Sequence, residues 1–169
     1  MVAAGTQELR TERLILRKLR ESDAGELYEG GCLGKTPGEA LDLVRKMMEY
    51  NDDPMNFHWA LEYQGRAVGR IKAWEVSPRD EYAQLGYEIA ESYRCKGLMS
   101  EAVAAVCRYL LAEAALNRVY CMVRETNYAS CRVCEKAGMM LDGVMRRHFR
   151  QPDGTYTDVR VYSILACEI

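Results

Sequence analysis

The sequence predicts an α/β fold: one domain over residues 1–169, built on a mixed β-sheet of about seven strands with about four helices. Apolar residues alternate in the strand-like stretches and recur every three or four positions in the helix-like ones. One long helix links strand-like stretches at 82–90 and 119–123, and such a crossover joins parallel strands. Short turns link the other strands, so we expect the sheet to be antiparallel at both ends.

The composition fits a soluble domain with a sizeable core, because 49% of the 169 residues are hydrophobic and 28% are charged. A formal net charge of −2 gives no global positive field for binding nucleic acid. No uninterrupted apolar run is long enough to cross a membrane, so no membrane partner is expected. The N-terminal tract lacks the basic and apolar regions of a secretory signal.

The seven cysteines are odd in number and scattered, which argues against a disulfide framework and for a reducing, cytoplasmic location. Cys131 and Cys134 form a C-x-x-C pair on a predicted helix, with no second pair and no histidine nearby. We therefore expect no metal site, and favour packed thiols over zinc or redox chemistry.

The N-terminal third is predicted to hold one strand and two helices. Residues 13–17 form the strand, and Ser22 caps the first, short helix. Thr36 and Glu39 make a capping box, with a proline at the first position of the second helix. That helix is expected to end near Asn51.

The middle of the chain is predicted to form three consecutive antiparallel strands. They span residues 57–63, 67–76 and 82–90, and turns at 64–65 and 77–80 join them. A long helix then runs to about residue 116.

Asn117 is expected to end the long helix in the left-handed conformation, before the strand at 119–123. A shorter helix follows over residues 128–137 and stops at Gly138. Strands at 140–150 and 156–166, joined by a Pro-Asp-Gly turn, complete the sheet as a hairpin.

A basic stretch at residues 93–102 leads into the long helix and is a candidate site for binding an anion. Its sequence is Tyr-Arg-Cys-Lys-Gly-Leu-Met-Ser-Glu-Ala. The N–H groups of a first helical turn are free, and the helix dipole adds positive charge. Arg94 and Lys96 add full charges, and Gly97 lets the backbone approach a phosphate closely. On spacing alone, phosphate binding and simple solvation of these basic residues both remain open. The G-x-x-x-x-G-K-[ST] pattern of nucleoside triphosphatases is absent.

This stretch resembles the R/Q-x-x-G-x-G/A pyrophosphate loop of the GNAT acetyltransferases, although Met99 stands where Gly or Ala is commoner. Residues 127–130 and 135–138 resemble the N-x-x-S/A…E-K-x-G helix of that family. Residues 11–17 and 142–148 resemble the subgroup that includes the ribosomal-protein N-terminal acetyltransferases. The four motifs occur in the family's order across nearly the whole chain.

The resemblance implies acetyl-coenzyme A as donor and a primary amine as acceptor, joined by direct attack in a ternary complex. It implies that the two parallel strands splay so that the pantetheine arm enters between them. The backbone of residues 87–89 would bind that arm and polarise the thioester carbonyl. The residues implied to bind the coenzyme are Tyr87, Ile89, Arg94, Cys95, Lys96, Gly97, Leu98, Met99, Ser100, Asn127 and Ser130.

The acid that protonates the leaving thiolate is not the usual one. Asn127 is interpreted as a helix N-cap, a coenzyme contact or both. Relatives often carry a tyrosine seven residues after this asparagine, and this chain has Cys134 at that position. Ser130 or Cys134 is the candidate replacement, with protonation by water and simple helix packing as alternatives.

The base is also unusual, because relatives often place a glutamate where this chain has Gln84. Glu88 lies four residues on, hence on the same face of the strand, and is our candidate. Its alternatives are an exposed carboxylate or a salt bridge to Arg94. His58 and His148 are weaker candidates.

Tyr128, Tyr156 and Asp158 are candidates for the acceptor pocket. The acceptor could be a protein α-amine or a small amine. The absence of the usual acid and base favours a rival hypothesis, a coenzyme-A-binding regulatory module with little or no catalysis. A homodimer through an edge strand is a further expectation.

Overall fold

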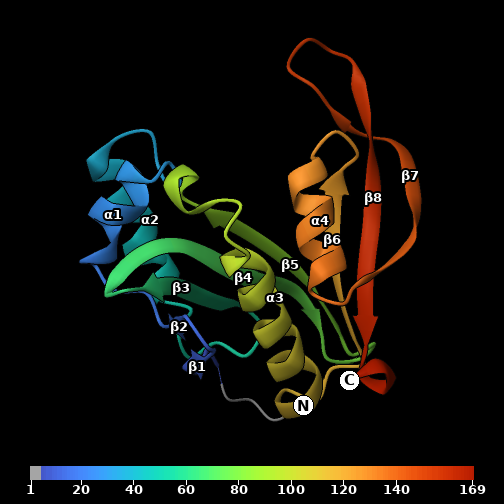
Figure 1. The fold of residues 1–169 in the computed structure, drawn as a ribbon, viewed down its shortest axis with the longest axis horizontal. Helices are drawn as coiled ribbons and strands as arrows, with labels where there is room; N and C mark the ends of the chain where they lie inside the picture. The colour runs from blue at the N-terminus through green and yellow to red at the C-terminus, as the bar shows by residue number, and fades with distance from the viewer. Residues whose placement is uncertain (1–4) are drawn as a thin grey trace.

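The computed structural model describes residues 5–169 and shows an eight-stranded mixed sheet with helices on both faces (Figure 1). The strands are β1 (Leu9–Arg10), β2 (Ile15–Arg17), β3 (Phe57–Tyr63), β4 (Arg66–Ser77), β5 (Tyr82–Ile89), β6 (Arg118–Arg124), β7 (Met140–Arg150) and β8 (Tyr156–Leu165). The α-helices are α1 (Asp23–Glu29), α2 (Pro37–Met48), α3 (Leu98–Arg108) and α4 (Tyr128–Lys136). Residues 1–4, part of the tract expected to lack a signal, lie outside the described residues.

The sheet order is β1-β2-β3-β4-β5-β6-β8-β7, and in the described chain only β5 and β6 are parallel. The α/β class and the mixed sheet are therefore confirmed. The sequence missed β1, which pairs Leu9 with Leu16, because two residues are too few for any periodic signal.

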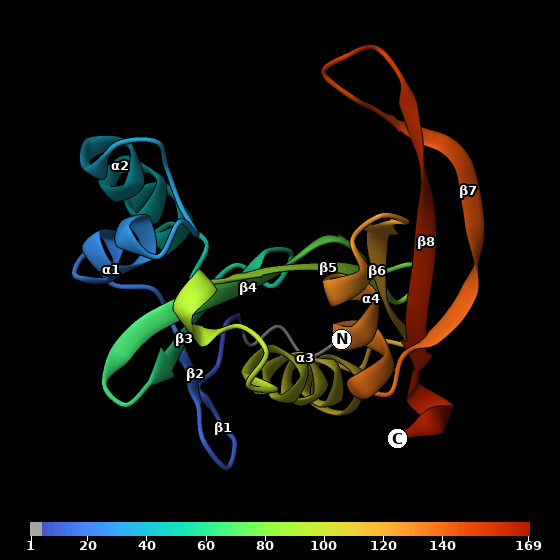
Figure 2. The same ribbon diagram turned by 45° about the horizontal axis from the view of Figure 1, so that its top comes forward.

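The helices divide between the two faces of the sheet (Figure 2). The larger core packs α3 and α4 against one face, around fully buried side chains such as Trp59 and Leu110. The smaller core packs α1 and α2 against the N-terminal strands through Leu27 and Val44. Among residues 5–169 no helix is long and apolar enough to cross a membrane.

The helix ends agree with the sequence in two places and differ in two. Thr36 accepts from Glu39 N at 3.1 Å, and Gly138 ends α4 with φ +88°. However, α2 ends at Met48, before Asn51, and the long helix continues past Arg108 as a π-helical turn over Tyr109–Glu113. The wider turn places the left-handed residue at Ala115 (φ 54°), so Asn117 does not end the helix as predicted.

The two parallel strands separate, as expected. Their last paired residues are Leu85 and Cys121, although β5 continues to Ile89 and β6 to Arg124. Each strand keeps its outer partner over the separated part, because β4 pairs with β5 up to Ile89 and β8 pairs with β6 up to Arg124. The result is a fork that opens toward the start of α3 and α4 (Figure 1).

The cysteines are free thiols, and both members of the C-x-x-C pair are buried on α4. Within the described part of the chain, no three or more His, Cys, Asp and Glu side chains are grouped so as to hold a metal ion. Both cysteines are packed in the larger core, and the Cys134 thiol also contacts the Tyr87 hydroxyl at 3.3 Å.

A buried ion pair fixes α1 to the sheet. Two nitrogens of Arg17 donate to the two carboxylate oxygens of Asp23 at 2.8 and 2.9 Å, and Arg17 Nε donates to Glu62. Only 8% and 3% of the Arg17 and Asp23 side chains are exposed. The bonds to Asp23 raise the pKa of Arg17, so the guanidinium stays charged.

We predict that Asp23→Ala lowers the free energy of unfolding by about 3–5 kcal/mol, because it leaves a buried cation without its main partner. Urea unfolding followed by circular dichroism measures this. Glu21→Ala removes the partner of Arg45 in a pair whose side chains are half exposed, and should leave the midpoint unchanged. Equal losses in the two variants would contradict the prediction.

Candidate active site

A cavity of about 680 Å³ lies between the end of β5, the start of α3 and one side of α4. All the predicted coenzyme-binding residues except Lys96 line it, and so does Glu88. The sequence missed four other lining residues that could bind a ligand, namely Gly31, Tyr93, Arg132 and Lys136. The structure therefore brings the predicted loop, strand end and helix start together at one site.

The loop before α3 is shaped by two left-handed residues, Cys95 (φ 61°) and Gly97 (φ 77°). The first bond within the helix runs from Glu101 N to Gly97 O, at 3.1 Å. The N–H groups of the preceding helical residues therefore have no acceptor inside the helix and are available to an anion.

Hydrogen bonds from the Arg13 side chain fix the conformation of this loop. Arg13 donates through Nη1 to Lys96 O at 2.9 Å and through Nε to the Glu101 carboxylate at 2.7 Å. A Cβ on Gly97 would lie 3.4 Å from the Arg13 guanidinium. The loop is thus fixed before any ligand arrives.

Cations surround the larger cavity. Arg94 lines it, with its Nε 3.4 Å from the Ile89 carbonyl oxygen, whereas Lys96 turns its ammonium over the Tyr93 ring at 5.1 Å. Arg132 and Lys136 reach it from α4. Their i, i+4 spacing puts both on one helix face, and this spacing is the signal that could have identified them in the sequence.

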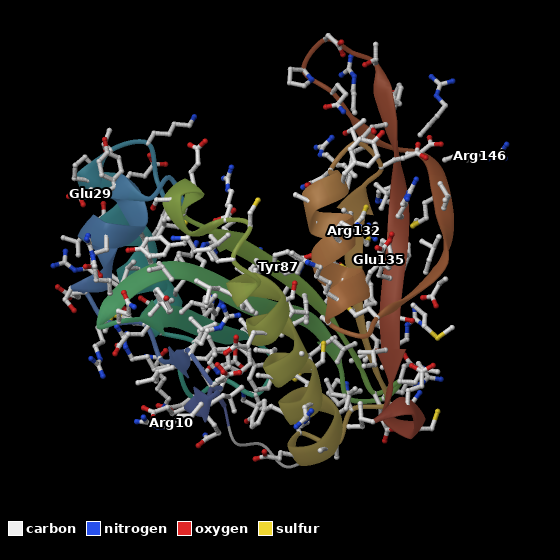
Figure 3. The ribbon with its side chains drawn as sticks, in the orientation of Figure 1. Arg10, Glu29, Tyr87, Arg132, Glu135 and Arg146 are labelled. Carbon is white, nitrogen blue, oxygen red and sulfur yellow. The ribbon has the colours of Figure 1, made fainter. Side chains whose placement is uncertain are left out.

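Tyr87 lies on β5, between the ribbons of that strand and α4 (Figure 3). Its hydroxyl contacts both candidate acids on α4. Its hydroxyl is 2.8 Å from Ser130 Oγ and 3.3 Å from Cys134 Sγ, and it donates to Ser130 O at 3.2 Å. Asn127 is the N-cap of α4, since its Oδ1 accepts from Ser130 N at 3.1 Å. Burial raises the pKa of Tyr87 well above its usual range, so the phenol stays protonated.

Sequence reasoning assigned Tyr87 a backbone role and missed this hydroxyl. Cys134 itself is completely buried and lines neither cavity. The tyrosine that relatives carry on this helix is thus absent, but a phenol reaches the same part of α4 from the neighbouring strand.

A second cavity, of about 270 Å³, lies in the fork between β5 and β6; we call it the fork cavity. Tyr87, Asn127 and Ser130 line both cavities, so the two cavities adjoin at these three residues. The other residues that line the fork cavity are Leu85, Gly86, Cys121, Met122, Val123, Arg124 and Phe149.

Glu88 and Gln84 lie on the same face of β5, but their surroundings differ. Glu88 accepts from Arg70 Nε at 3.0 Å and Nη2 at 2.8 Å, so its salt bridge is to Arg70 and not to Arg94. Half of its side chain is exposed. Gln84 accepts from the Tyr120 hydroxyl at 3.2 Å and lines neither cavity.

The remaining candidates lie outside both cavities. His58 is buried and stacked on Tyr50, and burial, with Arg70 and Lys72 nearby, lowers its pKa to about 4. The others are on the surface of the C-terminal hairpin or of α4: His148 contacts Phe149, Tyr156 lies under Arg147, Asp158 accepts from Arg147 N, and Tyr128 is exposed.

Comparison with known proteins identifies the fold and the family. The family model described as an acetyltransferase (GNAT) domain matches residues 13–140. The chain is 26% identical to the uncharacterized N-acetyltransferase YoaA of Bacillus subtilis over 93% of its own length and 96% of that protein. It is 27% identical to the ribosomal-protein-serine acetyltransferase of Escherichia coli over 57% of its length and 53% of that protein.

Among solved structures, the ribosomal L7/L12 α-N-protein acetyltransferase RimL in complex with coenzyme A matches with a TM-score of 0.82 at 20% identity. That match covers 94% of this chain and 98% of RimL. A structural likeness at this identity establishes the shared fold, and the family model, which matches most of the chain, establishes membership. The chain belongs to the GNAT acetyltransferase family.

Proposed function

We propose that this protein transfers the acetyl group of acetyl-coenzyme A to a primary amine by direct attack in a ternary complex. The observation that carries the proposal is that two cavities share Tyr87, Asn127 and Ser130 in their linings. The larger cavity reaches the start of α3, and the other lies inside the fork. The larger cavity would hold the coenzyme, with its pyrophosphate at the N–H groups after Gly97. Arg94, Arg132 and Lys136 would neutralise phosphate charge.

The unpaired edge of β5 suits the pantetheine arm. Residues 86–89 face β6 without pairing with it. An extended amide-containing arm can take up hydrogen bonds that a neighbouring strand would otherwise make. The coenzyme sulfur would then lie near Tyr87 and Ser130, where the cavities meet.

In the proposed reaction a C–N bond forms to the thioester carbonyl carbon and the C–S bond breaks. Because the Tyr87 phenol is hard to ionise, it serves as a hydrogen-bond donor that stabilises charge developing on sulfur. The proton that completes the thiol comes from the ammonium of the adduct, through hydroxyl groups or solvent. Ser130 shares a hydrogen bond with the Tyr87 hydroxyl and would help to position it. The buried Cys134 thiol contacts the same hydroxyl.

Glu88 is the proposed base. It lines the larger cavity, its side chain is half exposed, and Arg70 holds its carboxylate. It would take a proton from the incoming ammonium through water, which leaves the amine neutral for attack. The cytoplasmic location and the homodimer expected from the sequence stay predictions.

The enzyme proposal predicts that the protein binds acetyl-coenzyme A and that at least one primary amine stimulates thiol release. Calorimetry measures binding, and a thiol reagent measures release across a panel of peptides and small amines. Gly97→Ala should weaken binding roughly tenfold, since a left-handed alanine costs about 1–2 kcal/mol. Gly25→Ala, at an open helical position, is the control. Tight binding with no release from any amine would favour the regulatory module.

Tyr87→Phe should lower kcat about 10²–10³-fold, the usual effect of removing one hydrogen bond to a developing anion. Acetyl-coenzyme A binding should change little, because the phenyl ring still fills the space beside α4. Tyr82→Phe, on the same strand but at its other end, is the matched control. An unchanged kcat in Tyr87→Phe would remove the phenol from the mechanism.

Glu88→Gln should lower kcat/KM about 10²–10⁴-fold, with the largest deficit at the low-pH limit, where amines are protonated. Coenzyme binding should be preserved. Glu91→Gln, an exposed neighbour, should behave as wild type. Identical pH profiles for Glu88→Gln and wild type would show that another group, or solvent alone, takes the proton.

A further inference from the structure

The charge in the lining of the fork cavity is entirely positive. Of the residues that line it, Arg124 is the single charged one, and none is an aspartate or glutamate. A cationic acceptor, such as a polyamine, would find no counter-charge in this lining and would meet Arg124 instead. An acceptor with an anionic group would find a fixed cation.

Arg124 is held in place without an ion-pair partner among the described residues. Its guanidinium carbon lies 4.8 Å from the centre of the Phe149 ring, and its Nη1 donates to Gln151 Oε1 at 3.2 Å. A guanidinium has five N–H donors, so several remain available to a ligand. Stacking on a ring leaves its edge free for a planar, bidentate contact.

Glu125 follows Arg124 in the chain, and Asp158 precedes Val159, the register partner of Arg124 on β8; both carboxylates have other hydrogen-bond partners. Glu125 accepts from Arg160 Nη2 at 3.5 Å, and Asp158 accepts from the backbone N–H of Arg147 at 2.7 Å. Neither lines the fork cavity. Arg124 is solvent-exposed and forms no ion pair with a described carboxylate, so its guanidinium is available to a ligand in the fork cavity.

A second cation lies on the other side of the fork. Lys72 of β4 pairs in register with Gly86, which lines the cavity. Its ammonium lies 4.0 Å from the centre of the Trp74 ring, and no ion pair joins it to a described carboxylate. The Trp74 ring crosses Gly86 so closely that a Cβ there would be 2.8 Å from it. Lys72 lines neither cavity, and burial lowers the pKa of its ammonium, so Arg124 is the cation that a ligand in the fork cavity would contact.

We propose that the acceptor carries a carboxylate within a few bonds of the amine that is acetylated, and that Arg124 binds this carboxylate. The inference rests on the proposed acetyl transfer and assigns its acceptor class. Two sources share the chemistry: the α-carboxylate of a free amino acid, and an acidic side chain at the start of a peptide. The carboxylate would lie at the Arg124 end of the fork cavity, which has a volume of about 270 Å³, and the pantetheine arm would lie along the β5 edge on its opposite side.

The test compares matched acceptors that differ only in charge. One arm uses peptides that begin Ser-Asp or Ser-Asn; the other uses free amino acids and their amides. In one of the two arms, the kcat/KM for thiol release should be at least about tenfold higher for the acceptor with the carboxylate than for its neutral counterpart. The arm that shows this preference identifies whether the carboxylate belongs to a peptide side chain or to a free amino acid. Arg124→Gln should remove the preference through KM and leave acetyl-coenzyme A binding unchanged. Arg124→Glu should favour a Ser-Lys peptide.

Arg79→Gln, in the turn at the far end of β4, is the matched control and should keep the preference. Thiol release without preference for the acid in either arm overturns the inference. So does a preference that Arg124→Gln leaves intact. Calorimetry of the same acceptors on protein loaded with coenzyme A separates the two proposals: Arg124-dependent binding of the acid without any thiol release supports the inference and contradicts acetyl transfer.

Discussion

The site depends on one feature of the sheet: the pairing between β5 and β6 stops at Leu85 and Cys121, before either strand ends. Backbone N–H and C=O groups inside a sheet need partners, and a fork leaves a row of them without a neighbouring strand. Here each strand stays paired on its outer side, so only the inner edges are open. Tyr87 lines the fork cavity, and its hydroxyl is bonded to Ser130 of α4, which places a phenol beside these open edges.

The sequence predicted the parts of the fold that have local signals. The long strands and helices, the parallel crossover and the Gly138 stop each follow from periodicity or from a backbone conformation that few residues adopt. The π-helical turn after Arg108 has no such signal, because apolar residues fill both the α and the π arrangement. Ala115 then takes the left-handed position that the sequence assigned to Asn117, since the wider turn shifts where the helix ends.

The site likewise contains parts that the sequence predicted and parts that it did not. The loop around Gly97 was predictable because its residues are contiguous and its function uses backbone groups. The phenol–Ser130 contact joins residues 43 positions apart, and the side on which a tyrosine ring points depends on strand register and on the helix opposite. Similarly, Glu88 pairs with Arg70 because the two are opposite each other across β4 and β5, a register that a reading of one strand cannot supply.

Net charge is a poor guide to this protein's ligands. The chain is slightly acidic, yet three cations line the larger cavity, while its one acidic lining residue, Glu88, is paired with Arg70. The proposed coenzyme pyrophosphate would account for Arg94 in the loop and for Arg132 and Lys136 on α4. It does not account for Arg124, which lines the other cavity beyond the Tyr87 hydroxyl. Arg124 has no ion-pair partner among the described residues, and this is the basis for proposing an acceptor that carries its own negative charge near the amine.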